Sequence, residues 1–125
     1  MRQFLVMCIA TLLMSVGVWA QKGPVLTLVD KKIETKSVKH NTPVTAKFRI
    51  KNDGDAPLII FEASATCDCT KATWPKQPIL PGKQAEIEVV FDGTKLGKFN
   101  KPVYITTNAN DKREVIFLKG EVFEK

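Results

Sequence analysis

The chain has 125 residues, the length of a single ordinary domain. It carries 19 Lys and Arg against 13 Asp and Glu, a formal net charge of +6, with both signs mixed along the chain. Because no long block of like charge occurs and no aromatic residues interleave with a basic cluster, this composition indicates a solvated surface and argues against nucleic-acid binding.

Residues 1–20 have the pattern of an export signal. Arg2 supplies the positive start, Phe4 to Val18 is almost wholly apolar, and Val18-Trp19-Ala20 resembles a signal-peptidase cleavage site. The apolar run has about 15 residues, short of the roughly 20 that span a bilayer. We expect cleavage after Ala20. The mature protein, residues 21–125, would then be one domain in the periplasm or at the cell surface, with no stable membrane span.

Cys8 raises the alternative of a lipid-modified cysteine. Leu5-Val6-Met7-Cys8 matches a lipobox only loosely, because Met7 stands where a small residue is expected and most of the apolar run follows Cys8. We interpret Cys8 as an ordinary hydrophobic residue of the signal.

The mature chain has the periodicity of β-strands. Apolar and polar side chains alternate along Val44–Lys51 and along Gln84–Phe91, as in strands with one buried face. Leu58–Phe61 is a continuous apolar run, which suits a strand buried on both faces or one at a crossover. Further strands, rich in β-branched and aromatic residues, are predicted over Val25–Val29, Val103–Thr107 and Val115–Val122.

Turn signals separate these runs, and no long stretch has helical spacing. The signals are Asn52-Asp53-Gly54-Asp55 before Pro57, Pro81-Gly82, Asp92-Gly93 with Gly97, and Asn108 to Asp111. Pro81-Gly82 predicts a type II turn, and Asn108 to Asp111 suits a hairpin connection. About seven short strands in a mature chain of about 105 residues predict an antiparallel β-sandwich.

An ordered set of motifs resembles the DUF1573 family over nearly the whole mature chain. They are Phe48-x-x-x-Asn52-x-Gly54-x-x-Pro57-Leu58-x-Ile60, Cys67-Asp68-Cys69-Thr70, Trp74-Pro75, Pro81-Gly82 and Leu118-Lys119-Gly120. The resemblance implies an immunoglobulin-like sandwich related to major-sperm-protein and ASPM–SPD-2–Hydin modules. It also implies export in bacteria, many of them Bacteroidota, and no established activity. Asp68 stands where the family usually has glycine, so any property that needs that glycine does not transfer.

Cys67 and Cys69 are the one candidate site, with Asp68, Thr70, Lys71 and Trp74 as neighbours. In an exported protein a pair of thiols tends to close into a disulfide. On an extended strand the two Cα atoms would lie about 6.5–7 Å apart, so a bridge needs a local bend. Lys71 would favour a thiolate here, whereas Asp68 would disfavour it.

Three interpretations of this pair remain open: a structural clasp, a redox-active pair and a soft-metal site. Two thiolates suit Cu(I), and zinc needs four ligands, of which only His40 and Asp68 would be further candidates. His40, which precedes Asn41-Thr42-Pro43, is more typical of a loop than of a ligand. We therefore assign no metal and no cofactor.

The sequence favours a binding module over an enzyme. Ser37 and Ser64 have no catalytic motif around them, and no glycine-rich phosphate loop occurs. We expect a non-catalytic module that binds another envelope protein, or itself, by strand addition at open edges, with Val25–Val29 and the last strand as the edges. The alternative is a thiol-dependent redox or Cu(I)-binding protein acting through Cys67 and Cys69.

Overall fold

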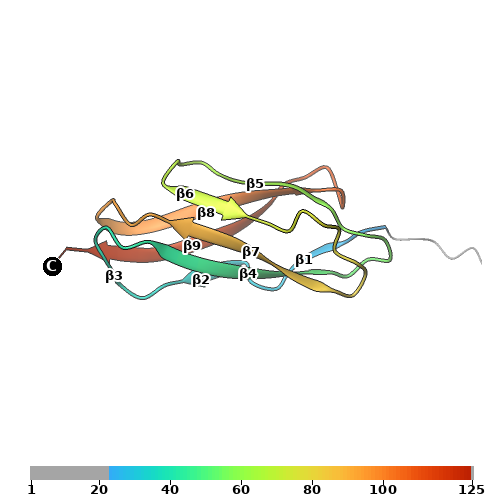
Figure 1. The fold of residues 1–125 in the computed structure, drawn as a ribbon, viewed down its shortest axis with the longest axis horizontal. Helices are drawn as coiled ribbons and strands as arrows, with labels where there is room; N and C mark the ends of the chain where they lie inside the picture. Colours follow the sequence, from blue (N-terminus) through green and yellow to red (C-terminus); the bar gives the residue numbers. More distant parts are fainter. Residues whose placement is uncertain (1–22, 125) are drawn as a thin grey trace, which may run out of the picture.

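The computed structural model describes residues 23–124, which form two packed sheets and no helix (Figure 1). None of these residues therefore belongs to a helix long and apolar enough to cross a membrane. The predicted export segment, with Cys8 and the cleavage site after Ala20, lies outside this range.

The first sheet has four antiparallel strands in the order β1-β4-β7-β6. Its strands are β1 (Leu26–Leu28), β4 (Val44–Asn52), β7 (Gln84–Phe91) and β6 (Thr70–Thr73). The long β4–β7 pair, in register from Val44↔Phe91 to Lys51↔Gln84, forms the centre of this sheet, and β1 and β6 are its edges.

The second sheet has five strands, and β9 and β8 lie at its centre. Its strands are β2 (Lys32–Glu34), β3 (Val38–Lys39), β9 (Glu114–Phe123), β8 (Gly97–Thr107) and β5 (Ile60–Ala65). β2 and β3 pair in succession with the same side of β9, parallel to it, while β8 pairs antiparallel with both β9 and β5. One edge is therefore β5, and the other is shared by β2 and β3.

The predicted β-sandwich is confirmed, with nine strands in residues 23–124. The sequence did not predict the three short strands β2, β3 and β6, and β2 and β3 make the second sheet mixed rather than wholly antiparallel. The expectation that the last strand is an edge is wrong, because β9 lies between β8 and the β2–β3 segment. Val25–Val29 does contain an edge strand, β1.

Leu58–Phe61 is not buried on both faces. Leu58 and Ile60 are buried, whereas Ile59 and Phe61 between and after them are 37% and 59% exposed. The run lies where the chain leaves the first sheet after β4 and enters the second at β5, which is the crossover position that the sequence also allowed.

The core lies between the sheets and is built by the inward residues of the alternating strands. In β4, Phe48 and Ile50 are fully buried while Lys47 and Arg49 are exposed, as period two requires. The buried hydrophobic residues are Val44, Ala46, Phe48, Ile50, Leu58, Ile60, Ala63, Ile79, Ile87, Val89, Phe91, Phe99, Val103, Ile105, Ile116, Leu118 and Val122. The two sheets meet through the Phe91 and Phe99 rings, whose centroids lie 4.4 Å apart.

Asn52 organises the turn that follows β4. Its fully buried side chain donates from Nδ2 to the carbonyls of Ala56 and Ile79, both at 2.8 Å, and accepts at Oδ1 from the N–H of Gly54 at 2.9 Å. A Cβ at Gly54 would collide with the backbone of residues 23–25, so that position requires glycine. The motif from Phe48 to Ile60 is thus scaffold.

Candidate functional site: the Cys67–Cys69 turn

Cys67 and Cys69 lie in a short turn that connects the edge strands of the two sheets. β5 ends at Ala65 in the second sheet, and β6 begins at Thr70 in the first (Figure 1). The cysteine pair therefore lies at an open side of the sandwich, where the chain crosses between the layers. Both cysteines are half-buried, whereas Asp68 between them is exposed.

The two cysteines form a disulfide, and a local turn makes it possible. The N–H of Thr70 donates to the carbonyl of Cys67 at 3.2 Å, which closes the turn over Asp68. The Cα atoms of Cys67 and Cys69 lie 5.2 Å apart as a result. This separation is within the usual range for a disulfide, whereas an extended strand would place the atoms near its upper limit.

The two sulfur atoms have different hydrogen-bond partners. The N–H of Cys69 donates to Sγ of Cys67 at 3.1 Å, and Sγ of Cys69 lies 3.6 Å from the hydroxyl of Thr70. The carbonyl of Cys69 accepts from the N–H of Asp92 at 2.9 Å, which fixes this cysteine against the end of β7. Cys69 is therefore attached to the first sheet by its hydrogen bond with Asp92. Cys67 is positioned by the turn that its carbonyl forms with the Thr70 N–H.

Cys69 lines a surface hollow of about 310 Å³ together with Pro43, Asp68, Lys71, Val90 and Asp92. The sequence singled out Asp68 and Lys71 as neighbours of the site, and the structure places both here. Nothing in the sequence indicated that Pro43, Val90 or Asp92 would lie beside the cysteines. These residues reach the site only because β7 pairs with both β4 and β6, which brings Val90 opposite Thr45 and Lys71.

The other residues that the sequence singled out have structural surroundings. Thr70 is buried and contacts Sγ of Cys69. Trp74 is partly buried against the core and does not line the hollow. Nζ of Lys76 lies 3.2 Å from the centroid of the Trp74 ring. His40 lies in the turn after β3, where its Nε2–H donates to the carbonyl of Thr94 at 2.9 Å.

The pair does not belong to a larger metal-ligand cluster in residues 23–124. No group of three or more His, Cys, Asp or Glu side chains there has the arrangement of a metal site. A bridged pair has no thiolate, and soft metals such as Cu(I) bind thiolates. Metal binding at these cysteines would therefore first require reduction.

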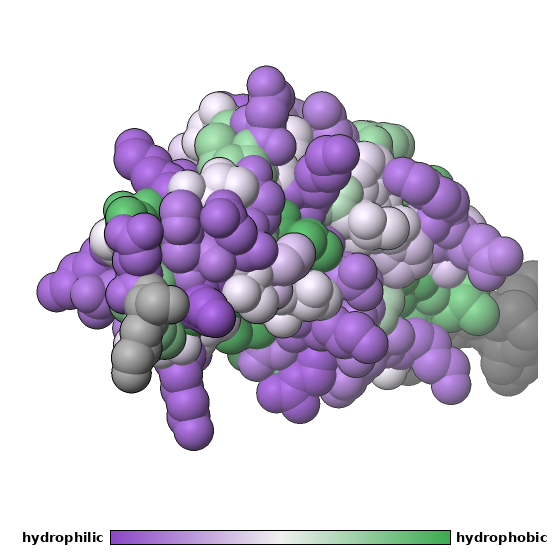
Figure 2. Space-filling view, turned by 60° about the vertical axis from the view of Figure 1, so that its left-hand side comes forward, coloured by the Kyte–Doolittle hydropathy of each residue, from purple (hydrophilic) through white to green (hydrophobic). Residues whose placement is uncertain are grey.

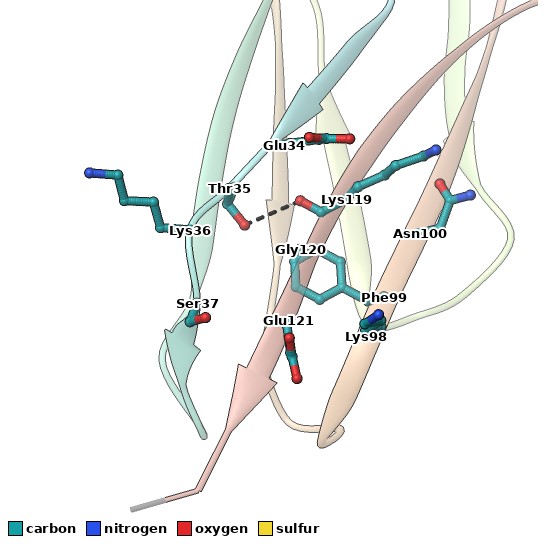
Figure 3. Close-up of a pocket in the computed structure, with 10 residues that line it drawn as sticks. All are labelled: Glu34, Thr35, Lys36, Ser37, Lys98, Phe99, Asn100, Lys119, Gly120 and Glu121. Carbon is teal, nitrogen blue, oxygen red and sulfur yellow. Dashed lines mark hydrogen bonds between the residues drawn. The ribbon is translucent and has the colours of Figure 1, made fainter.

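A larger hollow, of about 680 Å³, lies where residues 35–37 leave β9 between β2 and β3 (Figure 3). At the hollow, Gly120 allows Thr35 and Phe99 to pack closely, since a Cβ there would collide with Oγ1 of Thr35 and with Cζ of Phe99. The charged groups around it do not converge: Figure 3 shows Lys36 and Lys119 extending in opposite directions. Because its neighbours leave no room for a Cβ, we interpret Gly120, the last residue of the Leu118-Lys119-Gly120 motif, as a packing position.

The face in Figure 2 is mostly hydrophilic, and its hydrophobic side chains form small separate areas. Large hydrophobic residues with substantial exposure do occur among the described residues: Val29, Ile59, Phe61, Leu80, Leu96 and Phe123. Phe61 is the most exposed of them, at 59%, and it lies on β5, the strand that leads into the disulfide turn.

A family model described as "Protein of unknown function (DUF1573)" matches residues 26–122. A search of the curated proteins found no match. Several solved structures are similar, at identities that establish the fold alone. A protein of unknown function from Porphyromonas gingivalis W83 is 17% identical, with a TM-score of 0.70 over 84% of this chain and 50% of that chain. This chain thus spans about half the length of that neighbour.

Two further neighbours, an ASPM–SPD-2–Hydin-type domain and a major-sperm-protein domain, have the same fold. The ASH / PapD-like domain 7 of human CEP192 is 9% identical, with a TM-score of 0.65 over 96% of this chain and 99% of that chain. WR4, a major-sperm-protein family member from C. elegans, is 7% identical, with a TM-score of 0.50 over 78% and 97%. The sandwich is thus of the immunoglobulin-like type that these domains share.

Proposed function

Because the chain belongs to the DUF1573 family, whose function is unknown, we propose a function from its own surface: it is an exported, non-catalytic β-sandwich module that binds another envelope protein through β5. The predicted export segment at residues 1–20 and the Cys67–Cys69 disulfide support an oxidising compartment outside the cytoplasm. The observation that carries the binding proposal is the exposed Phe61 on this edge strand.

β5 is a sheet edge with one side open. Its other side pairs with β8, from Ile60↔Thr107 to Ala65↔Val103. The backbone groups on the open side can accept a further strand from a partner, and main-chain hydrogen bonds then supply affinity. The neighbouring edge, β6, belongs to the other sheet, so a segment added to β5 would extend the second sheet alone.

A bulge in β5 lies at Phe61, which faces outward next to the buried Ile60 as the alternation of a strand requires, and it leaves the following residue, Glu62, facing outward as well. The register shifts between Ile60 and Glu62, which leaves Phe61 without an opposite residue on β8. Bulges often re-aim a side chain, and they also interrupt continuous strand pairing. A partner strand would therefore pair with Glu62–Ala65. The Phe61 ring would be buried against the partner just beyond the end of this paired stretch. Buried aromatic side chains are typical anchors of protein interfaces.

Site-specific crosslinking in the native envelope tests this proposal. We expect a photoreactive amino acid at position 61 to crosslink to one partner protein, and Phe61→Ser to abolish recovery of that protein. Position 96 is the matched control, because Leu96 is also an exposed hydrophobic residue, at 46%, and lies outside β5.

Crosslinking at position 96 and the Leu96→Ser variant should leave recovery of this partner unchanged. Equal crosslinking at both positions, or none at position 61, would contradict binding through β5. Thermal unfolding of both variants checks that they remain folded, which is expected because neither side chain is in the core.

A further inference from the structure

The two cysteines of the disulfide differ in their position relative to the smaller hollow. Cys69 lines the 310 Å³ hollow beside β6, whereas Cys67 is not among the residues that line it. A thiol that enters this hollow therefore meets Cys69 first. The carbonyl of Cys69 accepts a hydrogen bond from the N–H of Asp92, so this cysteine is held in a fixed position just before the start of β6.

The two sulfur atoms also differ as leaving groups. The N–H of Cys69 lies 3.1 Å from Sγ of Cys67 and is held there by the turn that the Thr70 N–H closes. A hydrogen-bond donor stabilises the charged form of an acid, so this N–H favours a thiolate on Cys67 once the bridge opens. The contact of Sγ of Cys69 with the Thr70 hydroxyl is longer, at 3.6 Å.

We infer that Cys67–Cys69 is a thiol–disulfide exchange site with a fixed direction of attack. The thiolate of an incoming thiol bonds to Sγ of Cys69, the Sγ–Sγ bond breaks, and Cys67 leaves as a thiolate that takes a proton from water. A second thiol then attacks the mixed disulfide and releases Cys69. The two cysteines gain two electrons in total, and one dithiol or two monothiols are oxidised to a disulfide.

The charges around the hollow indicate the class of thiol. Asp68 and Asp92 contribute two negative charges and Lys71 one positive charge, so the lining carries a formal charge of −1. Asp68, which stands between the cysteines, is exposed to an incoming molecule. The site therefore favours a thiol that carries a positive charge near its sulfur. This exchange does not depend on the partner binding proposed for β5.

A trapping experiment on the oxidised mature protein tests the direction of attack. Cysteamine, a small cationic thiol, is added for short times, free thiols are blocked with N-ethylmaleimide, and fragment mass spectrometry locates both groups. We expect the product with cysteamine on Cys69 and maleimide on Cys67 to exceed the product with the reverse arrangement roughly threefold or more, because Cys67 is the better leaving group.

Adducts distributed evenly, or mainly on Cys67, would overturn the direction of attack. An oxidised peptide of residues 64–73 is the control for exchange without the fold. If the folded protein reacts no faster than this peptide, the hollow and its neighbours do not promote exchange, and the inference fails. Neither result bears on the β5 proposal, whose test uses Phe61.

Charge selection has its own test, the ratio of the reduction rates with cysteamine and with anionic glutathione. Asp68→Asn should lower this ratio about two- to fivefold, as expected for one surface charge acting over a short distance. Asp111→Asn, in the exposed β8–β9 connection, is the matched control and should leave the ratio unchanged. An unchanged ratio in Asp68→Asn would refute selection by this charge.

Discussion

At the scale of single residues, Asn52 connects three segments that are distant in the sequence. Its side chain binds the carbonyl of Ala56 in its own turn and that of Ile79 before β7, and its Oδ1 accepts from the N–H of Val25 at 3.3 Å. The Ile79 carbonyl also accepts from the N–H of Leu58 at 2.9 Å. The partly buried groups of Ala56 and Val25, in contrast, would lose this hydrogen bond without Asn52, and an unpaired buried polar group costs stability. The asparagine of the family motif is therefore a structural requirement rather than a reactive group.

Asn52→Ala should lower the free energy of unfolding by about 2–4 kcal/mol, because it leaves several partly or fully buried backbone groups without their partner. Chemical denaturation monitored by circular dichroism measures this change. Asn100→Ala is the control, since Asn100 is exposed on β8 and its removal should cost less than about 0.5 kcal/mol. Equal effects of the two substitutions would contradict the role assigned to Asn52.

Some residues of the candidate site could be predicted from the sequence, and others could not. Cys67, Asp68, Cys69 and Lys71 could be named because they are adjacent in the sequence and have distinctive chemistry. Asp92 could not, because an isolated acid after a strand is usually a solvated turn residue. Only the pairing of β6 with β7 brings its N–H to Cys69.

At the scale of elements, an ion pair stabilises the β1–β4 pair. Two N–H groups of the Arg49 guanidinium donate to the Asp30 carboxylate, Nε at 2.9 Å and a terminal nitrogen at 3.2 Å, and the backbone N–H of Arg49 also donates to it at 2.9 Å. These hydrogen bonds from Arg49 lower the pKa of Asp30 below its ordinary value of 3.8. The short edge strand β1 is thus attached to β4 by a charged contact as well as by its ladder.

This lowered pKa makes part of the stability depend on pH. A carboxyl group whose pKa is lower in the folded state contributes stability above the pKa of the unfolded chain and loses it as the pH falls through the folded value. The difference in melting temperature between the native protein and Asp30→Asn should therefore be largest well above pH 3.8 and shrink below it.

Thermal scans across pH 2–7 check this expectation, with Asp111→Asn as the control for loss of a charge without an ion pair. A constant difference at every pH would show that the carboxylate charge of Asp30 is not what stabilises the β1–β4 pair. Added salt should reduce the effect, since the pair lies at the surface.

At the scale of the whole molecule, the core rather than the disulfide holds the fold together. The disulfide joins residues only two apart in the sequence, whereas the buried hydrophobic cluster draws on both sheets. Closing so short a loop removes little entropy from the unfolded chain, because the effect grows with loop length. The pair is therefore available for exchange without unfolding the sandwich.

Replacing both cysteines with serine should leave the sandwich folded and cost about 1–2 kcal/mol, the value that loop entropy gives for a ring of a few residues. Denaturant unfolding of the oxidised, reduced and doubly substituted proteins measures the cost. Loss of the cooperative transition in the substituted protein would instead show that the pair is an essential clasp.

By itself, the sequence determined the fold class, the long strands and the candidate cysteines. These features depend on local patterns: period-two alternation, proline–glycine turns and reactive side chains. Such patterns can be recognised in the sequence without knowing which strands are neighbours. Leu80-Pro81-Gly82-Lys83 is an example: the Lys83 N–H donates to the Leu80 carbonyl, and Gly82 has a φ of 78°, as the predicted type II turn requires.

Only the tertiary structure decided which strands are edges and which residues surround the disulfide. We expected the last strand to be an edge, yet the parallel pairing of β2 and β3 covers it, and β5 is the edge on the other side of this sheet. A register shift against β8 leaves Phe61 without an opposite residue and places Glu62 outward beside it. Strand pairing is a relation between segments far apart in the chain, so no local pattern in either segment specifies it.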